Sequence, residues 1–532
     1  MKYGGELKLF YLEKKHDPRK NAELLTQLNG SQVDLKTALR ETEELFQQCI
    51  EKKLYPVPHG LKKQAYLEKI LSGSFHPLST VTELGAPSKT MMDAKGNVYP
   101  EWKEKLDHEH NNLLSHLTKV VNVADFGAIG DGRTDNTAAF IKAIGNGRVK
   151  VHIPEGIYIT KGIRLPSWIF LIGDGKGKTI IKLHGDAPKG TRLITNANHW
   201  RGNHHLFVKS MTLDWNVERL GDVPKTATWG THSSCLTYAN VTYGWVQDVE
   251  AINPGLHCFD ITSPLYNYAG DGYRAKGGSC YVWLDNLNGY GFGDDGITTH
   301  HSEKILISYS HMCDPSGRAH EKGFSNSNGI EIDDGSRDVM LVNNSTARCF
   351  GGVECKAHEN SSAAANVQII GHLSVNDNRS FNFRHIGHHK STDHESKTAF
   401  NLLATNLAAI APVYSDLYKD STPRGMVVSG YKNVVINHFT VIGDPDYDFN
   451  GNPVISIQYR AKKVIFNHVS IRDFHNAGAS IKVFGGANRA DSVQIQNIVI
   501  KNSASKAVEV GSGIQDATVS NVKEYFEPSL KK

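Results

Sequence analysis

The stretch FGDDGITTHHSEKI, residues 292–305, places two adjacent carboxylates behind a glycine and two histidines shortly after them. Carboxylates and imidazoles are the side chains that most often move protons in acid–base catalysis, and both can also bind metal ions. Paired carboxylates suit the hydrolysis of a glycosidic bond, in which one group protonates the leaving oxygen. Whether Asp294 and Asp295 can act in this way depends on the elements that position them.

A repeat in the second half of the chain predicts those elements. The segments NVVINHFTVIG, KVIFNHVSIRDF and SVQIQNIVIKN share an apolar-x-apolar-Asn pattern, with Asn437, Asn467 and Asn497 spaced 30 and 30 residues apart and Asn521 following 24 residues later. This spacing matches one coil of a parallel β-helix. Since coils stack about 4.8 Å apart, equivalent residues form ladders, and we predict an internal hydrogen-bonded asparagine ladder at a turn.

A sandwich or a barrel is the alternative all-β fold. Either would give strands at about 8–12-residue spacing, joined by regular NG or DG hairpin turns. Such turns are not regular in this sequence. We therefore predict an all-β solenoid for residues 120–527.

The segments HCFDIT, DDGITTH, SNGIEIDD, GGVECKAH and RSFNFRH align as five successive coils. If the apolar residue of each faces inward, the alternation of a strand turns the following residues outward. The first outward column comprises Asp260, Thr298, Glu331, Glu354 and Asn382. The second comprises Thr262, His300, Asp333, Lys356 and Arg384. Such columns predict a groove for an extended polymer, although polar outward residues are also ordinary in a solenoid.

Within this groove the carboxylates are the catalytic candidates. Asp295 is the first candidate for general acid or base, and its candidate partners are Asp294, Glu331, Asp333 and Glu354. Crowding raises the pKa of at least one carboxylate, which supplies a proton donor at neutral pH. Lys356 would neutralise charge that develops on the substrate. The residues predicted to bind substrate are His257, Asp260, His300, Asn328, Glu354, Lys356, His358 and Arg384.

No cofactor is assigned from the sequence. His300 is not part of an HxH or HExxH pattern, so its spacing does not indicate metal binding by imidazole. A hard divalent cation such as calcium could instead be held by Asp294, Asp333 or Asp334.

The N-terminal part of the chain differs in character. Residues 21–73 favour helix, and VDLKTALRETEELFQQCIEKK carries one apolar stripe: Leu35, Leu39, Phe46 and Cys49. Thr42 interrupts this stripe, which favours a short amphipathic hairpin over a coiled-coil stem. We predict a helical segment for attachment or oligomerisation over residues 1–73, and a linker and a further helix over residues 74–119.

Composition excludes several classes of protein. The 59 basic and 55 acidic residues give a net charge of only +4, which does not indicate a nucleic-acid partner. Seven cysteines without CxxC pairs argue against a disulfide framework and a structural zinc site. The first residues lack the apolar region of a signal peptide, and no run approaches a membrane span. We expect a product of the cytoplasm without membrane insertion.

Residues 125–144, DFGAIGDGRTDNTAAFIKAI, resemble the start of the pectate-lyase-like superfamily of right-handed β-helices. The coil segments GLHCFDI, GDDGI, SNG and ECK resemble those of polygalacturonase-type glycoside hydrolases, which carry NTDGFDI, GDDCI, GHG and RIK. Asp294 and Asp295 match the paired aspartates, and Lys356 matches the substrate-binding lysine. The departures are three: His257 stands for an aspartate, Asn328 for a histidine and Glu354 for an arginine.

The stretch around Asp294 and the segment SNGIEIDDGSRDVMLVNNSTARCFGGVECKAHE resemble tail appendage and tailspike proteins of phages of Gram-positive bacteria. This resemblance implies a homotrimer of the virion tail that acts at the bacterial surface, joined to other tail proteins by its N-terminal region. Such proteins bind, and often degrade, wall teichoic acid or surface polysaccharide. The alternatives are a non-catalytic receptor-binding adhesin and a bacterial polygalacturonase-like hydrolase.

Overall fold

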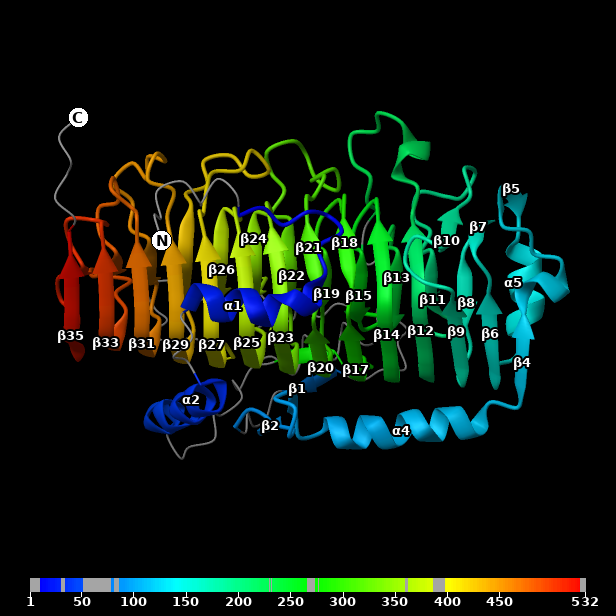
Figure 1. Cartoon of the computed structure of the whole chain (residues 1–532), viewed down its shortest axis with the longest axis horizontal. Helices are drawn as coiled ribbons and strands as arrows, with labels where there is room; N and C mark the ends of the chain where they lie inside the picture. The colour runs from blue at the N-terminus through cyan, green and yellow to red at the C-terminus, as the bar shows by residue number, and fades with distance from the viewer. Residues whose placement is uncertain are drawn as a thin grey trace.

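The computed structural model describes residues 10–29, 34–50, 86–228, 230, 232–265, 277–358, 362–385 and 398–526, together with the backbones of the strands β1 (Leu78–Thr80) and β16 (Tyr273–Ala275). From residue 119 onward, short parallel strands stack coil upon coil along one axis (Figure 1). The predicted fold class, a right-handed parallel β-helix with helices at its N-terminal side, is confirmed. The part of the helical prediction that covers residues 51–73 lies outside the described residues.

One sheet of the β-helix, called the short-strand sheet, contains twelve strands in the described part of the chain. All of its pairings are parallel. In spatial order its strands are β8 (Ile163–Leu165), β11 (Ile194–Asn196), β13 (Leu236–Ala239), β15 (Phe259–Thr262), β19 (Ile297–Thr299), β22 (Asn328–Ile332), β24 (Gly351–Ala357), β26 (Arg379–His385), β28 (Arg424–Ser429), β30 (Ile455–Gln458), β32 (Ile481–Val483) and β34 (Val508–Val510).

A second sheet, called the long-strand sheet, completes each coil. Its strands are β4 (Lys119–Asn122), β5 (Asp131–Asp135), β6 (Val149–Ile153), β7 (Gly156–Thr160), β9 (Ile169–Gly173), β10 (Thr179–Leu183), β12 (Asn203–Asp214), β14 (Val241–Ile252), β17 (Cys280–Asp285), β18 (Asn288–Tyr290), β20 (Glu303–Ser308), β21 (His311–Cys313), β23 (Arg337–Ala347), β25 (Ala365–Val375), β27 (Phe400–Ile410), β29 (Lys432–Ile442), β31 (Lys462–Arg472), β33 (Asp491–Lys501) and β35 (Ala517–Tyr525). The long strands bend at residues with left-handed backbone, among which asparagine is the most frequent because it tolerates positive φ at low cost.

The hydrophobic core lies inside the coils. The inward residues of the site coils are fully buried: Phe259, Ile297, Ile330, Val353 and Phe381. Helix α5 (Thr137–Ile144) covers the core at its N-terminal end, where Phe140 packs into it. The backbone N–H of Thr137 donates to the side chain of Asp135, which lies one residue before the N-cap, Asn136. Two short 3-10 helices, η3 (Val123–Phe126) and η4 (Val217–Leu220), also border the coils.

The N-terminal elements lie along the outside of the β-helix (Figure 1). The short helix η2 (Pro18–Lys20) leads into α1 (Asn21–Asn29), which packs on β25 and β27, and α2 (Leu35–Cys49) packs on β27 and β29. Phe46 and Cys49 contact a patch around Val435 and Ile465. Thr42, which interrupts the apolar stripe, is bonded to Thr405 at 2.7 Å. The stripe therefore covers a sheet of the same chain.

The segment expected as a linker contains a β-hairpin and leads into the predicted helix. The hairpin pairs β2 (Thr90–Met92) with β3 (Val98–Pro100), and α4 (Lys103–His116) follows. The side chain of Asp93 stabilises the turn of the hairpin by accepting hydrogen bonds from the backbone N–H groups of Lys95 and Asn97. Thr90 ties the hairpin to the β-helix by donating to Gln368 at 2.7 Å. Among the described helices, none combines the length and the apolar character that crossing a bilayer requires.

The asparagine ladder exists, but its predicted internal position is wrong. Asn467 donates to Asn437 at 2.9 Å, Asn497 to Asn467 at 2.7 Å and Asn521 to Asn497 at 2.6 Å. The ladder lies on the outer face, because Asn437 donates to the backbone of helix α2. The strand register pairs Asn467 with Gln496 and not with Asn497, so the ladder shifts by one residue at that coil.

Candidate functional site

The register of the short-strand sheet builds the first predicted column. Asp260 of β15 pairs with Thr298 of β19, which pairs with Glu331 of β22. Glu331 pairs in turn with Glu354 of β24, and Glu354 pairs with Asn382 of β26. The alignment of these five coils is therefore confirmed, because alternation along short, tightly stacked strands leaves only one register that buries the apolar residues.

The predicted site residues come together in one group, the carboxylate cluster. In the second column, Lys356 pairs with Arg384, and Asp333 lies 3.5 Å from His300 and 3.7 Å from Lys356. The cluster comprises Asp294, Asp295, Glu331, Asp333, His257, Asp260, His300, Asn328, Glu354, Lys356, His358 and Arg384.

Most of the cluster is buried, which differs from the open groove predicted. Asp260 and Glu354, for example, are 0% exposed. The cluster reaches solvent at two ends. At one end the side chain of Asp294 is 16% exposed beside His320, and at the other the side chain of His358 is 49% exposed.

The paired aspartates have opposite tendencies to ionise. Burial raises the pKa of Asp295 well above its usual value, and the charges of Asp294 and Glu331 raise it further. Burial would also raise the pKa of Asp294, but hydrogen bonds from His257 and His320 hold it well below its usual value. The surroundings therefore favour the protonated form of Asp295 and the ionised form of Asp294.

Two hydrogen bonds orient Asp295. The backbone N–H and the side-chain amide of Asn328 both donate to its Oδ1, at 2.9 and 3.0 Å. Its Oδ2 lies 3.5 Å from His257 Nε2, and this nitrogen is also 3.5 Å from Asp294 Oδ2. Oδ2 is thus the oxygen of Asp295 that can carry a proton.

Glu331 is the most fully bonded carboxylate. It accepts from Lys356 at 2.7 Å, from Asn328 at 3.0 Å and from Thr298 at 2.9 Å. Burial would lower the pKa of Lys356, but Glu331 and Asp333 raise it well above its usual value. The ammonium group is therefore held in place as a permanent charge.

Asp260 lies between two histidines. His257 Nδ1 is 3.7 Å from one carboxylate oxygen and His300 Nδ1 is 4.0 Å from the other. Among the described residues, neither oxygen of Asp260 has a partner within hydrogen-bonding distance. Burial would lower the pKa of His257 and of His300, but the surrounding carboxylates raise both. Asp260 is thus one of the carboxylates that favour the charged form of the two imidazoles.

At the second open end, His358 bonds Asp334 through its backbone N–H at 2.9 Å and through Nδ1 at 2.8 Å. The charge of Asp333 and this bond raise the pKa of His358 to about 9. Burial would raise the pKa of Asp333, but Lys356, His358 and His300 hold it well below its usual value. Glu354, in turn, is bonded by Arg384 and by Asn382.

Three subsets of the cluster have the donor set of a cation site. They are His257 with Asp294 and Asp295, His300 with Glu331 and Asp333, and Asp333 with Asp334 and His358, each with ligand atoms within 4.8 Å of one another. Lys356 already supplies a positive charge between Glu331 and Asp333. A cation therefore fits better at the Asp294 end than at the centre.

Sequence reasoning missed His320. Its Nε2 lies 2.9 Å from Asp294 Oδ1, and this carboxylate raises the pKa of the histidine. His320 belongs to an irregular segment between β21 and β22 that has no periodicity to align, so only its charged context, RAHEK, marked it.

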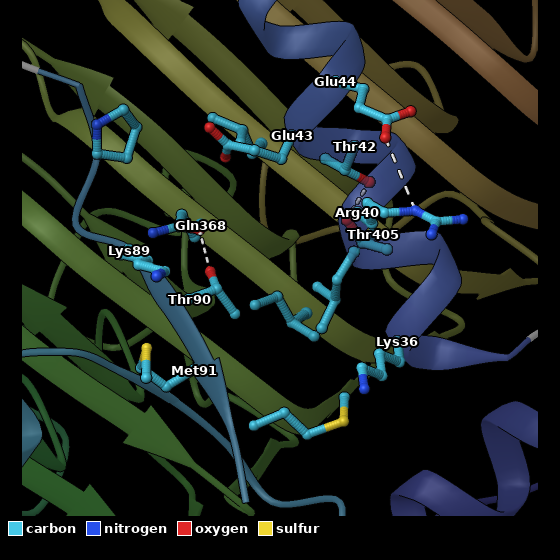
Figure 2. Close-up of a pocket in the computed structure, with 15 residues that line it drawn as sticks. Lys36, Arg40, Thr42, Glu43, Glu44, Lys89, Thr90, Met91, Gln368 and Thr405 are labelled. Atoms are coloured by element: carbon cyan, nitrogen blue, oxygen red, sulfur yellow. Dashed lines mark hydrogen bonds and ion pairs between the residues drawn. The ribbon is translucent and has the colours of Figure 1, made fainter.

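A cavity of about 260 Å³ opens beside Asp294, lined by His320, Arg318 and Lys322 among others. Next to it, the exposed rings of Phe324 and Tyr418 meet edge to face at 6.5 Å. Cationic and aromatic side chains therefore surround the open end of the cluster. A separate cavity of about 560 Å³ lies between α2 and β2, with Lys36, Arg40 and Lys89 at its edge (Figure 2).

Comparison with known proteins shows which proteins this chain resembles. The sequence family described as rhamnogalacturonase A/epimerase, pectate lyase-like, matches residues 120–354. The phage-related protein YobO of Bacillus subtilis is 52% identical over 428 residues, which are 80% of this chain and 53% of that protein. The pre-neck appendage protein of Bacillus phage phi29 is 42% identical over 406 residues, or 76% of this chain and 46% of that protein.

The crystal structure of the N-terminal fragment of bacteriophage phi29 gene product 12 superposes with a TM-score of 0.72 at 39% identity, and the match covers 79% of this chain and 69% of the fragment. The chain spans about half the length of the curated relatives that it matches.

Proposed function

We propose that this chain is a virion tail appendage that binds and depolymerises a bacterial surface polymer. The premise is that it belongs to the pre-neck appendage proteins of Bacillus phages and carries their pectate-lyase-like β-helix. The polymer class is wall teichoic acid or a surface polysaccharide. The observation that carries the proposal is the pair Asp294 and Asp295, whose pKa values are driven in opposite directions within one cluster.

The proposed reaction is acid–base hydrolysis. Asp295 gives the proton on Oδ2 to the leaving oxygen of the polymer, while ionised Asp294 takes a proton from water. The hydroxide part of that water bonds to the anomeric carbon or the phosphorus atom, and the bond to the leaving oxygen breaks. Proton exchange with solvent then returns both carboxyls to their starting states. His257, 3.5 Å from both, holds their relative position.

The surroundings of Asp294 suit an anionic or hydroxyl-rich polymer. Arg318, His320 and Lys322 line the adjacent cavity, and cations of this kind bind phosphate oxygens. Phe324 and Tyr418 offer apolar faces, on which sugar rings or glycerol carbons can pack. We propose that the polymer lies across this rim with the bond to be cleaved at Asp294.

The attachment and assembly of the protein are further proposals. We expect a homotrimer in the virion tail, joined to other tail proteins by residues 1–73 and acting outside the host at the bacterial surface. Support comes from the phage relatives and from the helices α1 and α2, which lie on the outside of the β-helix. Sedimentation of the purified full chain tests the trimer, because a monomer of 58.7 kDa would contradict it.

The experiment for the central proposal is incubation of the purified chain with teichoic acids and capsular polysaccharides, followed by mass spectrometry of soluble products. Phosphate-terminated glycerol or ribitol units would identify a phosphodiesterase, and oligosaccharides with reducing ends would identify a glycosidase. The variant Asp294→Asn should release neither while still binding the polymer. A chelator should leave release unchanged, because Lys356 supplies the positive charge.

A receptor-binding adhesin is the competing function, and the burial of most of the cluster favours it. In that case the exposed rim around Phe324 and Tyr418 would hold the polymer without cutting it. Binding without any product from any polymer would support the adhesin and contradict the hydrolase.

A further inference from the structure

Away from the carboxylate cluster, three side chains converge where helix α2 lies on the long-strand sheet. Glu41 belongs to α2, His438 to β29 and His468 to β31. One ligand atom of each lies within 4.8 Å of the other two. Glu41 Oε2 accepts from His438 Nε2 at 3.0 Å, and the two imidazole rings stack 4.7 Å apart at an angle of 13°.

The β-helix fixes the two histidines at equivalent corners of adjacent coils. Both have left-handed backbone, with φ of 56° at His438 and 53° at His468. In register with them, the same corner in other coils is occupied by Asn343, Gly371, Asn406, Asn497 and Asn521. The coils beneath Glu41 thus carry imidazoles where the other coils from β23 to β35 have glycine or asparagine. Because the rings are nearly parallel, their nitrogen edges can face the same point.

We propose that Glu41, His438 and His468 form a binding site for a divalent transition metal, zinc above all, which fastens helix α2 to the β-helix. Two imidazoles and a carboxylate are a common zinc ligand set, with bonds of about 2.0–2.2 Å. Ligand atoms around a tetrahedral ion with such bonds lie roughly 3.3 Å apart, close to the 3.0 Å between Glu41 and His438. Calcium and magnesium prefer all-oxygen sites.

Metal ions bind the deprotonated forms of imidazole and carboxylate ligands. Burial and the neighbouring His438 lower the pKa of His468. Burial would raise the pKa of Glu41, but hydrogen bonds from His438 and Asn437 lower it. The partial exposure of the side chains of Glu41 and His438 leaves room for a water ligand.

A metal ion bound at this position would hold helix α2 more firmly against the β-helix. The helix otherwise rests on the apolar contact of Phe46 and Cys49 with a patch around Ile465, and on hydrogen bonds that link Thr42 to Thr405 and Asn437. On its other flank, α2 borders the open cavity between Lys36 and Lys89 (Figure 2). Cys49 is 3% exposed and its Sγ lies 3.7 Å from the carbonyl of Lys463, so this thiol becomes reactive only when α2 lifts.

The test is calorimetric titration of the full, metal-stripped chain with zinc chloride, together with alkylation of Cys49 followed by mass spectrometry. The wild type should bind one more zinc ion than His468→Ala. Zinc at ten times its dissociation constant should slow Cys49 alkylation about tenfold, because metal binds only the docked state. In His468→Ala, zinc should leave the alkylation rate unchanged.

Two further variants separate the site from general damage to the fold. Glu41→Gln keeps the helix surface and a hydrogen-bond acceptor but removes the anionic ligand, so it should also lose one zinc ion. His475→Ala, at an exposed histidine after β31, should bind as much zinc as the wild type. Equal zinc stoichiometry in wild type, His468→Ala and Glu41→Gln would overturn the site, and zinc binding without protection of Cys49 would overturn its role in fastening α2.

Discussion

The outer face of the β-helix carries two kinds of ladder, one of amides and one of charges. In the C-terminal coils, Asn467 donates to Asn437 and accepts from Asn497, so each amide satisfies its neighbours. In the central coils, carboxylates repeat at Glu331 and Glu354 but cannot donate to one another. They depend on cations from other positions, Lys356 and Arg384.

The difference shows which repeated column the fold requires and which it only tolerates. An amide ladder is self-complementary, so it stabilises the stacking of coils. A buried carboxylate column is costly unless each charge is compensated, and Asp260 still lacks a hydrogen-bonding partner among the described residues. Buried ionisable groups of this kind gather at functional sites, which is why we place the chemistry in the central coils.

Removal of the acidic group of Asp295 should have the largest effect on polymer cleavage. Asp295→Asn keeps the size of the side chain but removes the proton that the leaving oxygen needs. We expect polymer cleavage to fall by about 10²–10⁴-fold, the usual contribution of a general acid, with little change in polymer binding. The matched control is Asn467→Ala in the amide ladder, which should cleave at the wild-type rate. Equal loss in both variants would mean that the defect is structural.

Removal of the central cation should have the largest effect on stability. Lys356→Met leaves Glu331 and Asp333 buried without their cation, and this should cost about 3–5 kcal/mol of unfolding free energy. Denaturant unfolding of the full chain measures it. The double variant Lys356→Met with Glu331→Gln should recover part of the loss, because the uncompensated charge is gone. No recovery would show that Lys356 acts through packing alone.

Interruption of the amide ladder should cost less. Asn467→Ala leaves partners on both sides unsatisfied, at Asn437 and Asn497, and should lower the unfolding free energy by about 2 kcal/mol. Asn521→Ala, at the exposed end of the same ladder, should change it by less than about 0.5 kcal/mol. Equal effects at the two positions would contradict a ladder whose strength depends on burial.

The smallest expected effect is on the way stability depends on pH. The pKa of His358 is raised from its ordinary 6.5 to about 9, so its stabilising contribution is complete below pH 6.5 and is lost as the pH rises through 9. His358→Gln should therefore reduce the fall in unfolding midpoint between pH 7 and 10. The amide ladder does not titrate in this range, so the effect of Asn467→Ala should stay constant. If the destabilisation caused by Asn467→Ala also changed with pH, the amide ladder and the charged column would no longer differ in their response to pH.

The register of the site could be predicted because short stacked strands obey a strict alternation. The segments around Ile297, Ile330 and Val353 each have one apolar residue that must enter the core, and this fixes their neighbours. The burial of the cluster could not be predicted, since it depends on irregular segments such as the one that carries His320. The exposed pair Phe324 and Tyr418 also comes from segments far apart in sequence.

The sequence contains a second amide ladder that its pattern could have indicated. Asn401 donates to Asn366 at 2.8 Å and Asn433 donates to Asn401 at 3.0 Å. All three have left-handed backbone at the start of a long strand. The motif is a single asparagine before each apolar run, in ANVQII, FNLLAT and KNVVIN, and it is weaker than the pattern around Asn437 because only one residue repeats.

The most direct measurement is cleavage of the identified polymer in water enriched in heavy oxygen, with mass spectrometry of the first products. Hydrolysis by Asp294 and Asp295 predicts one heavy oxygen atom per cleavage in the wild type, on the new end that carries the anomeric carbon or the phosphorus atom and not on the leaving hydroxyl, and no new ends in Asp295→Asn. Products without heavy oxygen would indicate elimination, and binding without products would indicate an adhesin. Either result would contradict acid–base hydrolysis at the carboxylate cluster.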